Sequence, residues 1–177
     1  LSDRVDHWIT QNEPQCYIGS GMASGIHAPG LKMNKKDCLQ AAHNSLLAHG
    51  RSVQAIRAEA RKTPVIGYAP AAWWLWSPVS DDPADIEACR KQTFCADEDQ
   101  VGGSAWWMDP VFLGKYPESA VKIVEEYMPR IGQGDMKLIS QPVDFLGINV
   151  YQTYLGKAAE DGSCITVDHK PGYDKTA

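Results

Sequence analysis

The apolar residues of this 177-residue chain gather in short runs that are separated by longer polar segments. Two runs, residues 65–69 and 144–150, are nearly continuous in apolar character. Such continuity is typical of strands that are buried on both faces of a parallel sheet. A third short run covers residues 5–9 and is followed by polar residues up to Pro14. We therefore expect three strands, at residues 5–9, 65–69 and 144–150.

Between the first two strands the apolar spacing changes to that of a helix. The helical positions recur at intervals of three, four and seven residues: Leu39, Ala42, Leu46, Val53 and Ile56. Asn34 is suited to cap the start of this helix, and Pro64 marks its end. Further helices are predicted from a cap at Ser80 or Asp82 to about residue 95, and over residues 118–128 and 132–139. The segment 70–83 and the polar tail after residue 157 are predicted to be loops.

The elements alternate in the order strand, helix, strand, helices, strand. This alternation is typical of parallel βαβ units, so we expect an α/β fold with parallel strands and flanking helices. No internal repeat or low-complexity run is visible, and we expect residues 1–177 to form a single segment. In such proteins the functional residues lie at the carboxyl ends of the strands.

Composition narrows the class of protein. The net charge of −5 and the scattered basic residues argue against a nucleic-acid or membrane partner. The longest apolar stretch, residues 69–76, contains a proline and is far shorter than the ~20 residues of a bilayer span. The five cysteines are odd in number and form no CxxC pair, which indicates reduced thiols in a cytoplasmic protein. No clustered ligands predict a metal site, and no cofactor is expected.

The strongest candidate for chemistry is Glu13, directly after the first predicted strand. Partial burial of a carboxyl group there would raise the free energy of the anion and suit the group to general acid catalysis. The preceding Asn12 offers both a donor and acceptors, which suits a sugar hydroxyl. Asn149 and Tyr151 stand in the corresponding position after the third strand. The alternative for Glu13 is a loop glutamate that caps the next segment.

The histidines and tryptophans have simpler interpretations. His27, His43 and His49 lack the spacing of a paired metal site, and we interpret them as packing or capping residues. Aromatic side chains stack on sugar rings, but packing is their commoner role. We apply the packing interpretation to five tryptophans: Trp73, Trp74, Trp76, Trp106 and Trp107.

Taken in order, several blocks of the sequence resemble the family 1 glycoside hydrolases. The blocks are residues 8–14, 25–30, 43–50, 80–85, 107–112 with 114 and 116–119, and 144–149. The resemblance covers residues 1 to about 155. It implies a partial (β/α)8 TIM barrel containing about strands four to six, and hydrolysis of β-linked glucosides or related oligosaccharides with retention of configuration.

The resemblance also implies roles for four residues. Glu13 matches the general acid/base, and Asn12 matches the asparagine that binds the 2-hydroxyl of the sugar. Asn149 and Tyr151 match the asparagine and second tyrosine of the Asn-Tyr-Tyr-Thr stretch of the family, where that tyrosine orients the nucleophile. Val150 and Gln152 depart from this stretch, which affects the fine shape of the site.

The Thr-Glu-Asn-Gly stretch that carries the nucleophile of the family does not occur in these 177 residues. The chain also begins without methionine, and we expect a longer natural chain. Two hypotheses follow: part of a β-glucosidase, or a catalytically inactive barrel fragment that folds as a homo-oligomer. The second is considered because a three-stranded piece of a barrel leaves two open sheet edges.

Overall fold

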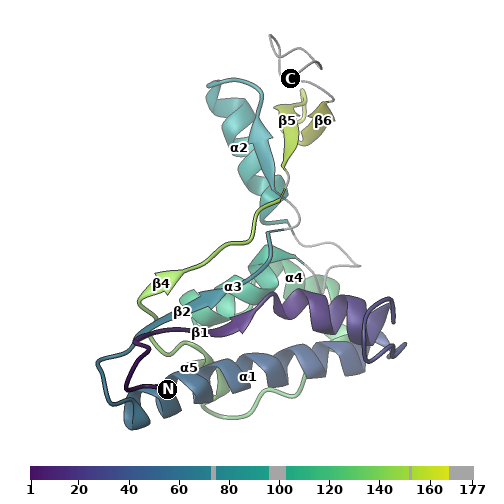
Figure 1. Ribbon diagram of the computed structural model, residues 1–177. Coiled ribbons are helices and arrows are strands. Elements are labelled where there is room, and N and C mark those ends of the chain that lie inside the picture. The colour runs from purple at the N-terminus through teal and green to yellow at the C-terminus, as the bar shows by residue number, and fades with distance from the viewer. Residues whose placement is uncertain (73–74, 96–102, 152, 168–177) are drawn as a thin grey trace. The chain divides into compact units, whose positions relative to one another are not determined.

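A computed structural model describes residues 1–72, 75–95, 103–151 and 153–167 (Figure 1). The chain divides into two compact units. The first contains residues 1–71 and 96–149, and the second contains residues 72–95 and 150–177. Each unit is described by itself below.

The sheet of the first unit is parallel, as the alternation of elements predicts. Strands β1 (His7–Asn12), β2 (Val65–Ala69) and β4 (Phe145–Leu146) pair in the order β1-β2-β4, all in parallel. A further parallel bridge joins Ala71 to Asn149 beyond the ends of β2 and β4. The carboxyl ends of all three strands therefore meet at one edge of the sheet (Figure 1).

The first strand lies later in the sequence than predicted, because polar residues extend it. The Thr10 hydroxyl contacts Nδ1 of His49 at 2.7 Å and donates to the Gly67 carbonyl at 3.2 Å. The Gln11 amide donates to the Ser45 carbonyl at 2.7 Å. These partners offset the desolvation of the Thr10 hydroxyl and of the Gln11 amide NH₂ group, so the strand continues to Asn12.

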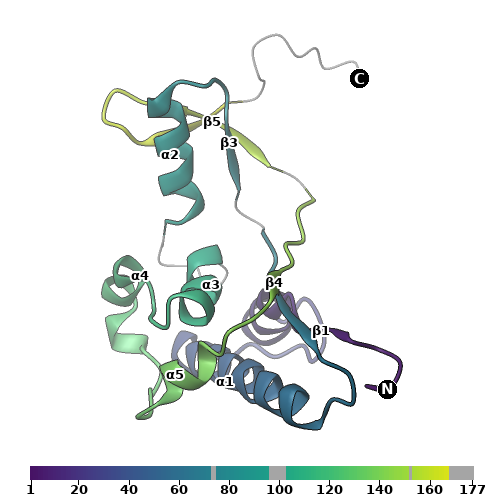
Figure 2. The same ribbon diagram turned by 90° about the vertical axis from the view of Figure 1, so that its left-hand side faces the viewer.

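The long helix is α1 (Lys35–Glu59), and its predicted cap is confirmed. The Asn34 side chain accepts a hydrogen bond from the backbone N–H of Asp37 at 3.0 Å. Helix α1 packs against β1, α3 (Ser104–Phe112) and α5 (Asp135–Ile139) (Figures 1 and 2). The predicted helix at 118–128 is instead α4 (Glu118–Ile123) followed by the 3₁₀ turn η2 (Glu125–Tyr127).

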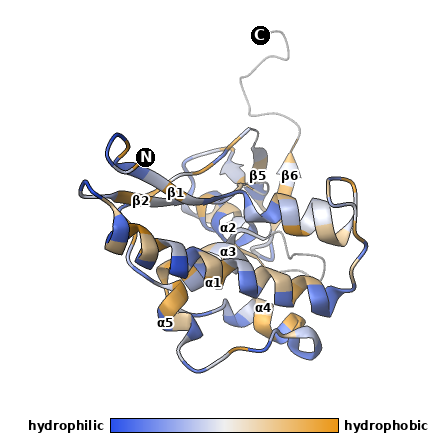
Figure 3. Cartoon of the chain, turned by 60° about the horizontal axis from the view of Figure 1, so that its bottom comes forward, coloured by the Kyte–Doolittle hydropathy of each residue, from blue (hydrophilic) through white to orange (hydrophobic). Residues whose placement is uncertain are grey.

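The hydrophobic core of the first unit is formed by the buried faces of its helices and β2. Hydrophobic and hydrophilic residues alternate along α1, as Figure 3 shows, so that one stripe of the helix is buried. The large side chains of the core are Ile18, Leu39, Leu46, Tyr68, Trp106, Trp107, Tyr116 and Ile139. The two tryptophans are 2% and 0% exposed, which confirms the packing interpretation for them, whereas Trp73 and Trp74 lie outside the described residues.

The third strand is much shorter than predicted. Only Phe145 and Leu146 form a ladder, although residues 144–150 are largely apolar. Leu146 and Ile148 remain 39% and 47% exposed, and Ile9 on β1 is 52% exposed. By the strand register Ile9 shares a face with Gly67, and Leu146 shares the opposite face with Tyr68, so partly exposed apolar side chains lie on both faces of this small sheet.

The second unit contains structure that the sequence pattern did not predict. Strand β3 (Trp76–Pro78) lies in the expected loop, and β6 (Cys164–Val167) lies in the expected tail. Strand β5 (Tyr154–Ala158) lies almost entirely before that tail, where no element was predicted. Strand β5 pairs in parallel with β3 and antiparallel with β6. These strands are short and their apolar residues are interrupted by Ser, Pro, Gly, Lys and Thr, so strand pairing and the stacking of Trp76 on Tyr154 stabilise them rather than a continuous apolar run.

Helix α2 (Pro83–Thr93) packs on the sheet of the second unit. Of the two predicted caps, Asp82 accepts from the Ala84 N–H at 2.8 Å. Ser80 instead donates to Asp85, whose other carboxylate oxygen accepts from the Ala158 N–H at 2.7 Å. The pKa of Asp85 is lowered by these hydrogen bonds, the one from Ser80 first.

Candidate active site

Glu13 occupies the first position after β1, at the edge where the parallel strands end. Its backbone N–H donates to the Ala69 carbonyl at the end of β2 at 2.8 Å. Its φ of +46° lies in the left-handed region, which non-glycine residues rarely adopt. Strain of this kind persists only where neighbouring contacts hold it, and it concentrates at functional sites.

Three of the four predicted site residues lie together, and we name them the Glu13 cluster: Asn12, Glu13 and Asn149. The Nδ2 group of Asn149 donates to Oε1 of Glu13 at 2.8 Å and to Oδ1 of Asn12 at 2.9 Å. The parallel bridge between Ala71 and Asn149 places this amide opposite the end of β1. Asn149 thus contacts Glu13 and Asn12, from which it is 136 and 137 positions away in the sequence.

Tyr151, the fourth predicted residue, belongs to the second unit, where it is 80% exposed. Its role beside the Glu13 cluster stays a prediction. The departure at Gln152 lies outside the described residues.

Two residues next to Glu13 were missed by sequence reasoning. Gln15 is 1% exposed, and its amide donates to the Ala71 carbonyl at 3.0 Å and accepts from the Ala71 N–H at 3.2 Å. The Cys16 thiol donates a hydrogen bond to Oε2 of Glu13, with 2.9 Å between the sulfur and the oxygen. The spacing of Glu13 and Cys16 could have predicted the second contact, because residues three apart in a helical turn lie on one face.

The turn that follows Glu13 continues into an unusual helix. Element η1 (Cys16–Ala23) is a π-helix, a rare form that occurs frequently at functional sites. It packs against α1. Gln15 and η1 together fix the backbone from which the Glu13 side chain projects.

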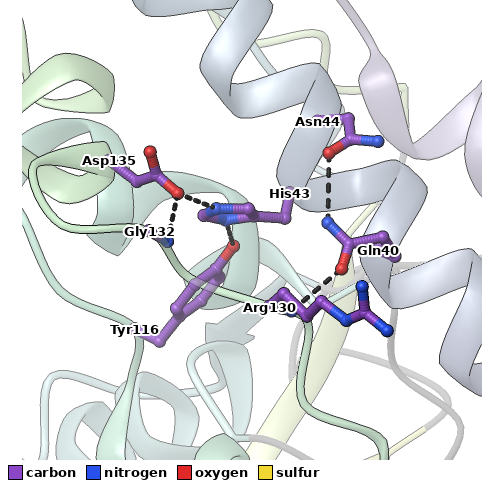
Figure 4. Close-up of polar contacts among 7 residues, drawn as sticks. All are labelled: Gln40, His43, Asn44, Tyr116, Arg130, Gly132 and Asp135. Carbon is purple, nitrogen blue, oxygen red and sulfur yellow. Dashed lines mark hydrogen bonds and ion pairs between the residues drawn. The ribbon is translucent and has the colours of Figure 1, made fainter.

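The histidines considered as candidate ligands, His27, His43 and His49, form no described hydrogen bond with the Glu13 cluster. His43, 1% exposed, contacts the Tyr116 hydroxyl at 2.8 Å and the Asp135 carboxylate at 3.1 Å (Figure 4). His49 is fully buried beside Thr10, and burial lowers its pKa to about 4. His27 is exposed in the loop after η1. The packing interpretation holds for His43 and His49.

Within the described ranges, no group of three or more His, Cys, Asp or Glu side chains is arranged to hold a metal ion. The five cysteines are free thiols, and the nearest described pair of sulfurs, Cys89 and Cys164, is 3.8 Å apart. In the same described part, no helix combines the length with the hydropathy that a membrane span requires.

Comparison with known proteins places the chain in a family. Residues 1–175 match the sequence model described as glycosyl hydrolase family 1. Beta-glucosidase A of Acetivibrio thermocellus is 37% identical over 155 residues, which cover 86% of this chain and 32% of the relative. The 1,4-beta-D-glucan glucohydrolase of Thermotoga neapolitana is 35% identical over 157 residues, covering 89% of this chain and 35% of the relative. The chain spans about a third of the length of the curated relatives it matches.

Solved structures agree with the sequence comparison. The beta-glucosidase from Thermotoga maritima in complex with glucoimidazole is similar with a TM-score of 0.69 and 32% identity, over 96% of this chain and 36% of that chain. A beta-glucosidase from Exiguobacterium marinum is similar with a TM-score of 0.68 and 32% identity, over 99% and 38%. From the Glu13 cluster at the strand ends, the family match over nearly its full length and these structures, we conclude that the chain belongs to glycosyl hydrolase family 1.

Proposed function

We propose that this chain carries the acid/base part of the active site of a retaining β-glucosidase, with Glu13 as the general acid/base. The observation that carries the proposal is the Glu13 cluster. Glu13 is half-buried at the carboxyl end of β1, and Asn149 holds its Oε1 from the neighbouring chain segment. Family 1 membership supplies the reaction class.

The complete fold in this proposal is an eight-stranded (β/α)8 barrel. Strands β1, β2 and β4 would be its fourth, fifth and sixth strands, and their parallel order supports that placement. In barrels of this kind the active site lies at the carboxyl face of the strands, which is where Glu13 stands.

The proposed reaction is a double displacement. A second carboxylate, supplied by a part of the barrel outside these residues, attacks the anomeric carbon while Glu13 protonates the departing oxygen. Glu13 then takes a proton from the water that releases the sugar from the second carboxylate. In retaining enzymes the two carboxyl groups lie ~5 Å apart, so that both reach the same bond.

The proposed substrate is a β-glucoside or a related oligosaccharide. The amides of Asn12 and Asn149 offer donors and acceptors for sugar hydroxyls. For Tyr151 we propose the role that its match in the family implies, which is to orient the nucleophile. The relatives named beta-glucosidase and 1,4-beta-D-glucan glucohydrolase support this substrate class.

The test is the substitution Glu13→Gln in a full-length family 1 enzyme that carries this segment. Glycosides with poor leaving groups should lose the most activity, because their departing oxygen needs a proton, and a positioned acid contributes ~10²–10⁴-fold. Activated aryl glucosides should form the glycosyl-enzyme and then stall. Azide should restore their turnover, because a small anion needs no general base.

Equal losses for good and poor leaving groups, without rescue by azide, would contradict the assignment of Glu13. Glu118→Gln is the matched control, since Glu118 lies in the first turn of α4 and is exposed. That variant should retain the activity of the parent enzyme.

The second candidate function is a catalytically inactive barrel segment that associates with itself. The exposed apolar residues of the sheet, Ile9, Leu146 and Ile148, favour it. The two candidates differ in a simple measurement, the hydrolysis of a chromogenic β-glucoside by the purified 177-residue chain. We expect no turnover above the background, because the nucleophile stretch of the family is not among these residues. Robust turnover that Glu13→Gln abolishes would contradict this expectation.

A further inference from the structure

The turn after β1 brings a thiol into contact with the proposed acid/base. The backbone N–H of Cys16 donates to the Glu13 carbonyl at 2.9 Å, which closes the turn. The Cys16 thiol then donates to Oε2 of Glu13, also at 2.9 Å. Asn149 donates to the other oxygen, Oε1, at 2.8 Å. The two carboxylate oxygens are therefore held from two sides by different donors.

We propose that Cys16 is a positioning residue of the active site, whose thiol holds Oε2 of Glu13 and so fixes the plane of the carboxyl group. This inference rests on the proposed function of Glu13. A carboxyl group with one held oxygen can still rotate about its terminal bond, whereas two held oxygens set its orientation. Correct orientation matters because small displacements of a catalytic group cost up to ~10²-fold in rate.

The backbone places the thiol accurately. Cys16 is the first residue of η1, and the residue before it, Gln15, is buried and joined twice to the backbone of Ala71. The position of Cys16 is thus tied to the same segment, beyond the end of β2, that is bridged to Asn149. The two residues that donate to Glu13, Cys16 and Asn149, are therefore both anchored to the backbone of Ala71, Cys16 through its neighbour Gln15.

The thiol is also suited chemically to this role. Burial first, and then the hydrogen bond and negative charge of Glu13, raise the pKa of Cys16 to about 12. The group therefore remains a neutral donor at neutral pH and brings no second negative charge to the site. A hydrogen bond to a carboxylate is stronger than one between neutral groups, which compensates for the weakness of a thiol donor.

The first test uses the 177-residue chain and needs no enzymatic activity. In Glu13→Gln the charge that holds the thiol proton is removed, so the Cys16 pKa should fall toward its ordinary value of 9.0. Alkylation of Cys16 at pH 9, followed by mass spectrometry, should accelerate about threefold for each unit by which the pKa falls, because the reactive thiolate becomes more abundant although each thiolate is a weaker nucleophile. The S–H stretching band of Cys16 should move to higher wavenumber in the same variant.

Cys38 is the matched control within the same chain. Its thiol is 1% exposed and donates to the Met33 carbonyl at 3.7 Å, far along the sequence from Glu13. Glu13→Gln should leave its alkylation rate and its S–H band unchanged. An unchanged rate and band at Cys16 would overturn the proposal. Equal changes at both cysteines would overturn it too, because they would report loss of structure.

The second test compares Cys16→Ser with Cys16→Ala in a full-length family 1 enzyme that carries this segment. Serine keeps a donor, and alanine removes it. Cys16→Ala should lose about tenfold more activity on glucosides with poor leaving groups than on activated ones, as expected for a misplaced acid. Cys16→Ser should restore most of that difference. Equal losses on both substrate types, or equal losses in both variants, would overturn the positioning role.

The two tests separate this inference from the proposed function. A kinetic result in which Glu13→Gln has no effect would reject the acid/base role, while the thiol measurements would still report the Cys16–Glu13 contact. Unchanged thiol measurements with a strong kinetic effect of Glu13→Gln would reject the role of Cys16 alone.

Discussion

At the scale of single residues, the unusual backbone conformation of Glu13 is held by hydrogen bonds of Glu13 itself and of its neighbour Gln15. A φ of +46° at a glutamate is held against its conformational preference by the Glu13 N–H bond to Ala69 and the anchoring of Gln15 on Ala71. Buried Gln15 exchanges two hydrogen bonds with one backbone unit, so its truncation would leave both backbone groups unsatisfied. The backbone strain thus falls on Glu13 itself.

A residue-scale prediction concerns the contact of His43 with Asp135 (Figure 4). The hydrogen bond from His43, followed by that from the Gly132 N–H, lowers the pKa of Asp135 below its ordinary value. A carboxyl group with a lowered folded-state pKa stabilises the fold above its unfolded-state pKa, and this contribution is lost as the pH falls through the lowered value. Asp135→Asn should therefore lower the urea midpoint at pH 7, and the difference from the wild type should vanish in acid.

The control for this prediction is Asp81→Asn, at an exposed position before α2. Its urea midpoint should follow that of the wild type at every pH. A difference between Asp135→Asn and the wild type that stays constant down to the most acidic pH at which the chain is folded would contradict the assigned role of the carboxylate.

At the scale of elements, the approach of α1 to α5 depends on one glycine. A Cβ atom at Gly50 would overlap the backbone carbonyl oxygen of Leu138. Backbone atoms cannot turn aside as a flexible side chain does, so the two helices would have to separate. The core residue Ile139 lies next to this contact and is fully buried.

We predict that Gly50→Ala destabilises the chain by about 1–3 kcal/mol, the usual effect of overpacking. This loss should appear although alanine favours a helix over glycine by ~1 kcal/mol. Urea denaturation measures the change. Gly19→Ala is the control, because a Cβ atom at Gly19 meets no atom within 4 Å. A Gly50→Ala variant as stable as the wild type would show that α1 and α5 adjust without loss.

At the scale of the whole molecule, the three-stranded sheet of the first unit has two open edges within the described residues. Strands β1 and β4 are its edges, and edge strands present unpaired backbone groups to other chains. Ile9 and Leu146 on these edges are 52% and 39% exposed, and each apolar side chain left in water forgoes ~1.5–3 kcal/mol. Association through this sheet would cover both features.

We predict that the 177-residue chain is a dimer or a larger soluble assembly at low micromolar concentration, joined through β1 or β4. A twofold dimer is the commonest closed form of such an assembly. Analytical ultracentrifugation measures the mass. Ile9→Lys and Leu146→Lys should weaken the association, whereas Ile86→Lys, at a 46% exposed position on α2, should leave it unchanged. A monomer of 19.5 kDa with strongly protected strand amides would contradict the prediction.

The sequence by itself determined the parts of this protein that depend on neighbouring residues. The spacing of Leu39, Ala42 and Leu46 and the cap at Asn34 specify α1, because helix periodicity and capping act within a few positions. The apolar run at residues 65–69 specifies β2, and the alternation of elements specifies a parallel sheet. The family was also identified from the sequence, through the order of several short motifs, whereas the acid/base role of Glu13 stays a prediction.

Only the tertiary structure decided the parts that depend on distant residues. Polar Thr10 and Gln11 extend β1 because they form hydrogen bonds with His49 and Ser45, and no local sequence pattern predicts those partners. The strands β3, β5 and β6 are too short, and their apolar runs too interrupted, to be recognised from the sequence, because pairing with one another stabilises them. Asn149 reaches Glu13 across 136 positions, and Cys16 reaches it through a turn whose geometry Gln15 fixes on Ala71. Local sequence therefore specified α1, β2 and the position of Glu13 after β1, whereas hydrogen-bond partners far apart in the chain determine how the Glu13 carboxylate is held.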